Sequence, residues 1–276
     1  MKERTLYSSA IILGISLSIL LFGVHAGIFI LALIAYFMQL ELYVLFEKIG
    51  LNPMKQFGLV CGAILIFGSY YLGSLDAGPD IFLVSFLLLI LMIARIDIKE
   101  GRMNSLMPTL FGFIYIPFFL HFYIQIHHLN TAAGNDSGSG IFLSFWVIIV
   151  ALSTDIGGYF FGKTLGKTKF SIISPKKTNE GVIGGILLAP LAGTLLLILF
   201  SSLKPEQFHW WQGFFIALPL ALTSIASDLL ESAFKRQAGV KDSSNLIPGI
   251  GGVFDMCDSL ILTAPLAYLL LKYFVY

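Results

Sequence analysis

Long apolar segments are the feature that most limits how this 276-residue chain can fold. A helix that crosses a membrane needs roughly 20 apolar residues, and about nine such stretches follow one another along the sequence. Hydrophobic residues make up 57% of the chain and charged residues 12%, with a mean hydropathy of +0.87, which excludes a soluble globular protein. We therefore predict an all-α polytopic integral membrane protein with about nine transmembrane helices. The expected spans are 6–23, 25–45, 57–74, 79–95, 105–126, 141–161, 182–203, 208–227 and 254–275.

The positions of lysine and arginine predict how these spans are oriented. Cytoplasmic loops of membrane proteins carry an excess of both residues, and alternating spans place nearly all of them on one side. The opposite loops carry the acids Asp76, Asp80 and Asp136 and little basic charge. We expect a cytoplasmic N-terminus, an external C-terminus and a multi-pass location in the cell (inner) membrane. The residues expected on the cytoplasmic side are Lys2, Arg4, Lys48, Lys55, Arg95, Lys99, Arg102, the five lysines between Gly162 and Glu180, Lys235, Arg236 and Lys241.

Other features of the composition exclude some partners and sites. The net charge is +1, and no basic helix or patch of mixed basic and aromatic residues is present, so we expect no nucleic-acid partner. Cys61 and Cys257 lie in apolar or membrane-edge segments without metal-binding spacing, which predicts packing roles for both. Glu41 and Glu47, near the end of the second span, are expected to pair with Lys48 or to face the protein interior.

The most highly charged stretch runs from Asp228 to Ser259, between the last two apolar segments. Two pairs of carboxylates stand out, and within each pair the residues are three apart, so on a helix they share one face and can converge on one cation. Ionisable groups at a membrane boundary are costly unless they are paired, hydrated or metal-bound, and they usually mark a functional site. Acids near a helix start can instead cap free N–H groups. The pairs are Asp228 with Glu231 and Asp255 with Asp258, accompanied by the cations Lys235, Arg236 and Lys241 and by the step Gly251-Gly252.

A second polar stretch runs from Asp155 to Gly185. Asp155 lies well within the sixth span, and the glycines that follow it permit either a close approach of helices or a break in the backbone. The following loop contains five lysines, which positive-inside topology explains in part. The fragment GKTLGK does not have the spacing of the nucleoside triphosphatase motif. An acid beside a lysine-rich loop favours a metal or nucleotide site over a neutral, hydrogen-bonded acid. The residues concerned are Asp155, Gly157, Gly158, Gly162, Lys163, Lys167, Lys169, Lys176 and Lys177.

Two sequence blocks resemble the phosphatidate cytidylyltransferases, or CDP-diacylglycerol synthases. The first, from Ser232 to Asp258, reads Ser-x-Phe-Lys-Arg-x4-Lys-Asp-x-Ser-x2-Ile-Pro-x2-Gly-Gly-Val-x-Asp-x2-Asp. The second, from Ser174 to Gly185, reads Ser-Pro-Lys-Lys-Thr-x-Glu-Gly-x2-Gly-Gly. Both blocks occur in the family order and together they cover the C-terminal part of the chain. The resemblance implies that the phosphate of phosphatidic acid attacks the α-phosphorus of CTP, so that CDP-diacylglycerol forms and pyrophosphate leaves.

The resemblance and the charges together assign roles to individual residues. Mg²⁺ would be held by Asp228, Asp255 and Asp258, which would make it the cofactor, with Glu231 and Asp242 as supporting groups. Lys235 and Arg236 would act on the reacting phosphates. The expected partners are CTP, phosphatidic acid and membrane lipids, and the resemblance also suggests a homodimer. Substrate-binding roles are predicted for Lys176, Lys177, Lys241, Asp155, Ser232, Gly251 and Gly252.

Two departures from the family pattern and three alternative functions remain at this point. The family usually has His where Ile250 stands and Arg where Met256 stands, so we expect Asp255 and Asp258 to lack a cationic neighbour and turnover to be slow. The alternatives are a CTP-dependent lipid (polyprenol) kinase, an ion-coupled transporter and a scaffold protein. We expect two regions, namely N-terminal transmembrane helices over 1–135 and a catalytic transmembrane region over 136–276 with charged loops 162–181 and 228–254.

Overall fold

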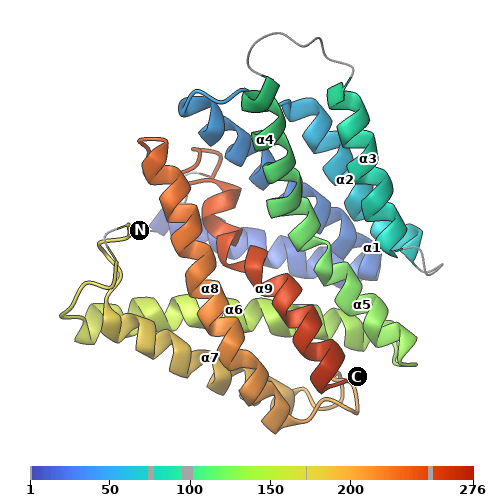
Figure 1. The fold of residues 1–276 in the computed structure, drawn as a ribbon. Coiled ribbons are helices and arrows are strands. Elements are labelled where there is room, and N and C mark those ends of the chain that lie inside the picture. The colour runs from blue at the N-terminus through green and yellow to red at the C-terminus, as the bar shows by residue number, and fades with distance from the viewer. Residues whose placement is uncertain (1, 74–77, 95–101, 172, 248–250) are drawn as a thin grey trace. The chain divides into compact units, whose positions relative to one another are not determined.

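A computed structural model describes residues 2–73, 78–94, 102–171, 173–247 and 251–276. These residues form helices joined by loops, without a β-strand among them (Figure 1). The chain order is α1 (Lys2–Lys48), α2 (Lys55–Tyr71), α3 (Gly78–Ala94), α4 (Arg102–Phe113), the π-helical segment η2 (Ile114–Phe118), α5 (Phe122–Ala132), α6 (Ser137–Leu165), α7 (Asn179–Leu199), α8 (Trp210–Gln237) and α9 (Val253–Phe274).

The predicted all-α membrane protein is confirmed, because in the described part of the chain six helical segments are long and apolar enough to cross a membrane. α2 and α3 have only 17 residues each, fewer than the roughly 20 that a membrane crossing needs. The first two predicted spans form the single run α1, which has a kink at Gly23, where φ is 61°. The six candidate spans are Phe22–Lys48, Met103–Ala132, Ser137–Leu165, Asn179–Leu199, Trp210–Gln237 and Val253–Phe274.

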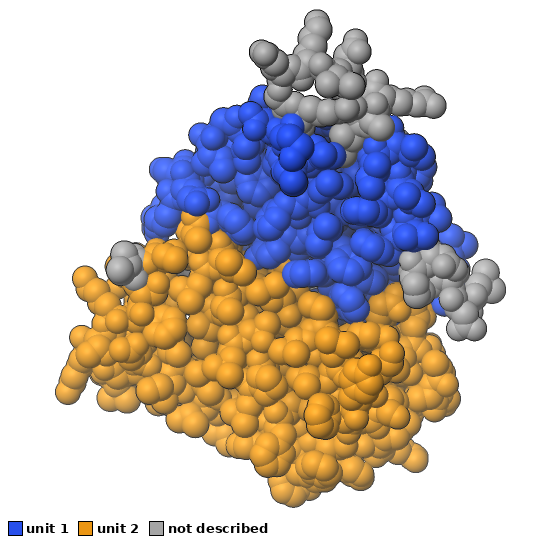
Figure 2. Space-filling model, in the orientation of Figure 1, with its two compact units in different colours: residues 1–124, 234–257 blue, residues 125–233, 258–276 orange. Residues whose placement is uncertain are grey.

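The chain forms two compact units, and each unit combines two segments that are separate in the sequence (Figure 2). Unit 1 contains Met1–Ile124 and Phe234–Cys257, and unit 2 contains Gln125–Ala233 and Asp258–Tyr276. The two boundaries at the C-terminal end fall inside α8 and α9, so each of these helices contributes residues to both units.

The interior of unit 1 combines an apolar cluster with a short chain of buried hydrogen bonds. Cys61 is fully buried in the apolar cluster, as its predicted packing role requires. Nearby in sequence, Gln39 Nε2 donates to Tyr43 Oη at 2.9 Å and to the Gly58 carbonyl oxygen at 3.1 Å. Tyr43 Oη in turn donates to the carbonyl oxygen of Thr109 at 2.9 Å. These bonds tie α1, α2 and α4 together, because buried polar groups need partners.

The interior of unit 2 depends on the close contact of α6 and α7. A Cβ atom on Gly157 would lie 2.8 Å from Gly185 Cα, and one on Gly181 would lie 2.6 Å from the Gly158 carbonyl oxygen. Glycine at these positions lets two backbones touch, and α6 continues without interruption to Leu165. Of the two roles predicted for these glycines, close helix approach is therefore correct and a backbone break is not.

Candidate active site

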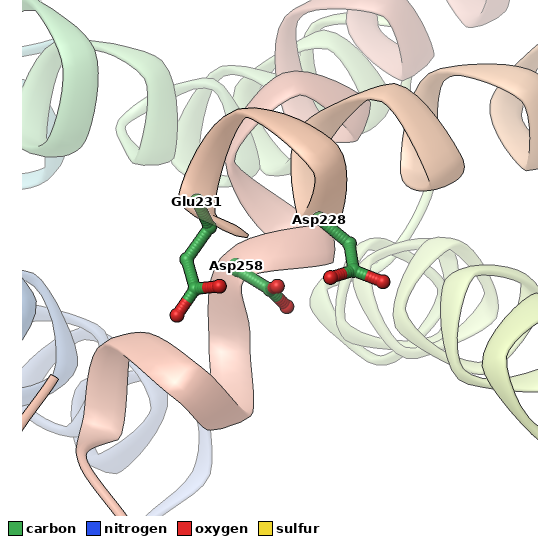
Figure 3. A group of neighbouring side chains, drawn as sticks. All are labelled: Asp228, Glu231 and Asp258. Carbon is green, nitrogen blue, oxygen red and sulfur yellow. The ribbon is translucent and has the colours of Figure 1, made fainter. Parts of the chain in front are cut away.

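Three carboxylates converge in unit 2, where α8 passes beside the start of the unit's α9 segment. Asp228 and Glu231 are three apart on α8 and therefore lie on one face, and Asp258 reaches toward them from α9 (Figure 3). One carboxylate oxygen from each residue lies within 4.8 Å of the other two. Glu231 and Asp258 are buried, with exposed fractions of 1% and 7%. The arrangement gathers oxygen ligands of the kind that Mg²⁺ prefers.

Short hydrogen bonds fix the position of Asp258. Its carbonyl oxygen accepts a bond from Ser227 Oγ at 2.5 Å, which links α8 to α9 next to the carboxylates. Its carboxylate oxygen Oδ1 accepts from the backbone N–H of Ser259 at 2.6 Å. Ser227 is fully buried, so neither helix can shift there without breaking a buried bond.

The charge balance of this cluster shows that it can accept a cation. Three carboxylates so close together repel one another unless positive charge is added. Lys177 supplies one charge, because its ammonium group forms an ion pair with Asp228 Oδ2. Asp155 on α6 also lies within electrostatic range of Asp228 and Lys177. A divalent cation would offset much of the negative charge that Lys177 leaves, so the residues present fit a Mg²⁺ ion.

Glu180 closes the loop that carries the lysines. Its oxygen Oε2 accepts from the backbone N–H groups of Lys167 and Thr168 at 3.1 and 3.3 Å, and Oε1 accepts from Thr168 Oγ1 at 3.0 Å. The backbone N–H of Asn179 also donates to the Thr168 carbonyl oxygen at 3.0 Å. These bonds bring the two ends of the loop together at the start of α7 and thereby limit where Lys177 can lie.

Asp255 has a different environment, in unit 1. Its Oδ1 forms an ion pair with Lys235 Nζ at 2.6 Å, and its side chain is 9% exposed. Its Oδ2 accepts from the backbone N–H groups of Ser243 and Gly252, both at 2.8 Å. The Ser243 hydroxyl also lies 2.8 Å from Oδ2, but its one proton is shared with Glu41. The bond from Gly252 is the helix-start capping that the sequence left open as an alternative. The expectation that Asp255 lacks a cationic partner is wrong, because Lys235 reaches it from α8.

Glu41 is the residue at this location that sequence reasoning missed. It is 5% exposed on α1, and it accepts four hydrogen bonds from residues more than 200 positions later. The donors are Ser243 Oγ at 2.8 Å, Ser244 Oγ at 2.7 Å, Val253 N at 3.0 Å and Phe254 N at 2.8 Å. Of the two predicted roles, Glu41 faces the interior. Glu47 instead pairs with Lys55 at 2.6 Å. The sequence offered one signal of this role, because Glu41 is an acid inside the predicted apolar span 25–45 and such acids usually have a functional role.

The predicted site residues divide between the two units. Arg236, Lys176 and Lys241 are all exposed, and Arg236 donates to the Val240 carbonyl oxygen at 3.1 Å. Ile250 lies outside the described residues. Unit 1 contains Lys235, Arg236, Lys241, Gly251, Gly252 and Asp255, and unit 2 contains Asp155, Lys176, Lys177, Asp228, Ser232 and Asp258.

Comparison of the sequence with known proteins shows which family the chain belongs to. The sequence profile of the cytidylyltransferase family matches residues 2–274, nearly the whole chain. The chain belongs to the cytidylyltransferase family. Among its relatives, the phosphatidate cytidylyltransferase of Synechocystis sp. is 30% identical over 293 residues, which cover 97% of this chain and 96% of that protein.

Two further relatives match the cytidylyltransferase-family chain over shorter regions at higher identity. The phosphatidate cytidylyltransferase of Bacillus subtilis is 38% identical over 162 residues, covering 58% of this chain and 56% of the relative. The phosphatidate cytidylyltransferase of Rickettsia bellii is 41% identical over 169 residues, covering 60% of this chain and 69% of the relative. The family resemblance of the sequence is thus confirmed.

Proposed function

We propose that the chain transfers the cytidylyl group of CTP to phosphatidic acid, producing CDP-diacylglycerol and pyrophosphate. The supporting observation is the match to the cytidylyltransferase family along residues 2–274, together with the phosphatidate cytidylyltransferase of Synechocystis sp., which aligns over 96% of its own length. The acidic cluster on α8 and α9 provides a location for the chemistry. The lipid substrate fits a multi-pass membrane protein.

The reaction joins two polyanions, and this sets what the protein must supply. A phosphate oxygen of phosphatidic acid forms a bond to the α-phosphorus of CTP, and the bond from that phosphorus to the bridging oxygen breaks. Pyrophosphate takes the electron pair and leaves. The attacking oxygen is already anionic, so the protein's main tasks are to align the two phosphates and to offset their charge.

Asp228 and Asp258 would hold Mg²⁺, and the position of Glu231 beside them supports a place for it in the same group. The ion, when bound, would neutralise phosphate charge and align the displaced groups. Lys177, which pairs with Asp228 in this structure, would be available to bind a phosphate oxygen of the substrate. The metal role predicted for Asp255 is untested, and it would require its carboxylate to give up at least one of its present partners. We therefore propose that the ion binds the unit 2 acids instead.

The other assigned roles follow from the resemblance and the charges. Lysine and arginine side chains bind phosphate oxygens, and arginine can do so with two parallel bonds. Glycine would allow the backbone to approach a ligand, although the Gly252 N–H is engaged with Asp255 in this structure. The residues for which these roles stay predictions are Lys176, Lys235, Arg236, Lys241, Asp155, Ser232, Gly251 and Gly252.

Two radioactive labels distinguish the transferase from a CTP-dependent lipid kinase. Purified protein in lipid nanodiscs receives phosphatidic acid, a polyprenol as the acceptor that a kinase would need, Mg²⁺ and CTP labelled at either the α- or the γ-phosphorus. We expect the α-label to enter the lipid fraction and the γ-label to leave as pyrophosphate. Label from the γ-position in the lipid, with none from the α-position, would establish the kinase instead. No transfer of either label, in protein that binds CTP, would refute both enzymes and return attention to a transporter or scaffold.

We further propose about nine spans with a cytoplasmic N-terminus, an external C-terminus and insertion in the inner membrane. Within unit 2, Tyr276 Oη donates to Asn130 Oδ1 at 2.7 Å. This bond supports placing the C-terminus and the loop after α5 on the same side of the membrane. The membrane-impermeant labelling of Lys176→Cys and Ser137→Cys should show opposite sides. Labelling of both from one side would refute this topology. The homodimer and the division into 1–135 and 136–276 also stay predictions, which mass measurement in nanodiscs and expression of the separate regions can test.

A further inference from the structure

The Glu41 carboxylate holds together parts of the chain that the family motif places near the reaction. Each of its two oxygens accepts one serine hydroxyl and one backbone N–H. Oε1 accepts from Ser244 Oγ and Val253 N, and Oε2 accepts from Ser243 Oγ and Phe254 N. Glu41 itself lies outside both sequence blocks that resemble the family. Its side chain is therefore an anchor supplied by α1 to the start of α9.

The two backbone donors explain why this position needs a carboxylate. The first N–H groups of a helix have no partner within the helix, and a negative charge there also interacts favourably with the helix dipole. The N–H groups of Val253 and Phe254 can only donate, and they point at different oxygens of Glu41. A glutamine would turn its NH₂ group toward one of them, so that two donors would face each other. The geometry thus requires two acceptor oxygens.

The surroundings of the carboxylate are packed closely enough to transmit its position. A Cβ atom on Gly252 would collide with both Ser243 Oγ and Glu41 Oε2. Ser243 also donates to Asp255 through its backbone N–H at 2.8 Å, and its hydroxyl proton is shared between Glu41 and Asp255, each 2.8 Å away. Since Asp255 is paired with Lys235, a shift of Glu41 would disturb residues with predicted catalytic roles.

We propose that Glu41 is a positioning residue of the transfer reaction, which fixes Ser243, Ser244 and the first turn of α9 in the geometry that turnover needs. α9 carries Asp258 four residues after Phe254, so the anchored turn immediately precedes a carboxylate of the acidic cluster. Glu41 touches no reacting group in this account and acts through the segments it holds. The proposal rests on the proposed cytidylyl transfer.

Three variants separate the loss of the second acceptor oxygen from the loss of side-chain volume. Glu41→Gln keeps the length of the side chain but has one acceptor oxygen, whereas Glu41→Asp is shorter but keeps two. Glu47→Gln is the matched control, because Glu47 lies on the same helix, is exposed and pairs with Lys55. Hydrogen exchange of the peptide that contains the Val253 and Phe254 amides reports on the anchor directly, in the full-length protein in nanodiscs and without substrate.

We expect Glu41→Gln to speed exchange of this peptide and to lower kcat about tenfold, the effect of one lost hydrogen bond to a charged group. The KM for CTP should change less than threefold, because Glu41 does not contact the nucleotide. Glu41→Asp should retain more turnover than Glu41→Gln, and Glu47→Gln should match the parent. Rates are expressed per folded protein, so a variant that is only less stable will show parental kinetics in its folded fraction.

Each of the other outcomes overturns a stated part of the proposal. Unchanged exchange at Val253 and Phe254 in Glu41→Gln would refute the anchor. Faster exchange with a parental kcat would refute a role in the reaction. Higher activity in Glu41→Gln than in Glu41→Asp would indicate that side-chain volume is what matters. If the parent itself transfers no cytidylyl group, the proposed function fails, and the exchange measurement alone then decides whether Glu41 anchors α9.

Discussion

Two groups of buried or partly buried acids in this protein differ in the groups that surround their carboxylates. In unit 1, Glu41 and Asp255 each accept bonds from serines and backbone N–H groups, and Asp255 also from a lysine. The single hydroxyl proton of Ser243 is shared between the two acids, at 2.8 Å from each. In unit 2, the carboxylates of Asp228, Glu231 and Asp258 face one another, and Lys177 pairs with Asp228. The first group has donors on every oxygen, whereas the second gathers acceptors.

This contrast shows how an acid's partners indicate its role. A carboxylate surrounded by donors is stabilised in its charged form and gains little from a metal ion, because binding the ion would break those bonds. Carboxylates that face one another are destabilised until a cation arrives. We therefore expect unit 1 acids to affect the structure and unit 2 acids to affect metal-dependent turnover, and four experiments can test this distinction.

The largest effect should come from Asp258→Asn. An amide is a weaker ligand for a hard cation than a carboxylate, and the loss of one group that stabilises charge in a transition state costs about 100- to 1000-fold in rate. The measurement is transfer of α-labelled CTP into lipid at saturating Mg²⁺, with Glu206→Gln as a control for an exposed acid of the same unit. Activity within threefold of the parent would remove Asp258 from the metal site.

The next effect concerns stability, which should fall on substitution in the first group and should not fall in the second. Asp255→Asn removes the negative charge beside Lys235, and we expect it to cost about 2 to 3 kcal/mol and to lower the thermal midpoint by several degrees. Asp258→Asn removes one of three neighbouring negative charges, so without Mg²⁺ it should unfold no earlier than the parent. Unfolding is monitored by tryptophan fluorescence in detergent. Equal destabilisation by both substitutions would contradict the distinction between the two groups of acids.

A smaller effect should be seen when Mg²⁺ is added to the protein alone. An ion present at ten times its dissociation constant stabilises the folded protein by about 1.4 kcal/mol. We expect a rise in the thermal midpoint of the parent and of Asp255→Asn, and none in Asp228→Asn or Asp258→Asn. Sodium chloride at equal ionic strength is the control for screening. A rise that Asp255→Asn abolishes and Asp258→Asn keeps would place the ion in unit 1.

The smallest effect is expected for Met256→Arg. The sequence alone suggested that an arginine here would speed turnover by supplying a missing positive charge. Because Lys235 already pairs with Asp255 at 2.6 Å, a second cation adds little, and we expect kcat/KM for CTP to change less than about threefold, which is under 1 kcal/mol. A tenfold increase would show that Lys235 does not replace the arginine of the family pattern.

The sequence predicted the helices well because hydropathy depends on local composition, and Asp228 and Glu231 share a face because they are three apart on one helix. Asp255 and Asp258 have the same spacing on α9, but spacing does not reveal that Lys235, Ser243 and Gly252 bind Asp255. α9 begins at Val253, so Asp255 lies in its first turn and caps Gly252, whereas Asp258 lies one turn further on. The role of Glu41 could not be read from its neighbours in sequence, since its partners are 202 to 213 residues away.

That separation has a consequence for how the protein is made. At roughly 5 to 20 residues per second, the ribosome needs roughly 10 to 40 s after Glu41 before it has added the serines and amides that will bind it. During that interval α1 is already available for insertion, with a carboxylate seven residues from its end and no native donors yet synthesised. The carboxylate must be hydrated or find other hydrogen-bond donors during that time. Unit 1 can therefore complete its fold only after nearly the whole chain has been synthesised, because the hydrogen-bond donors to Glu41 come from residues 243–254.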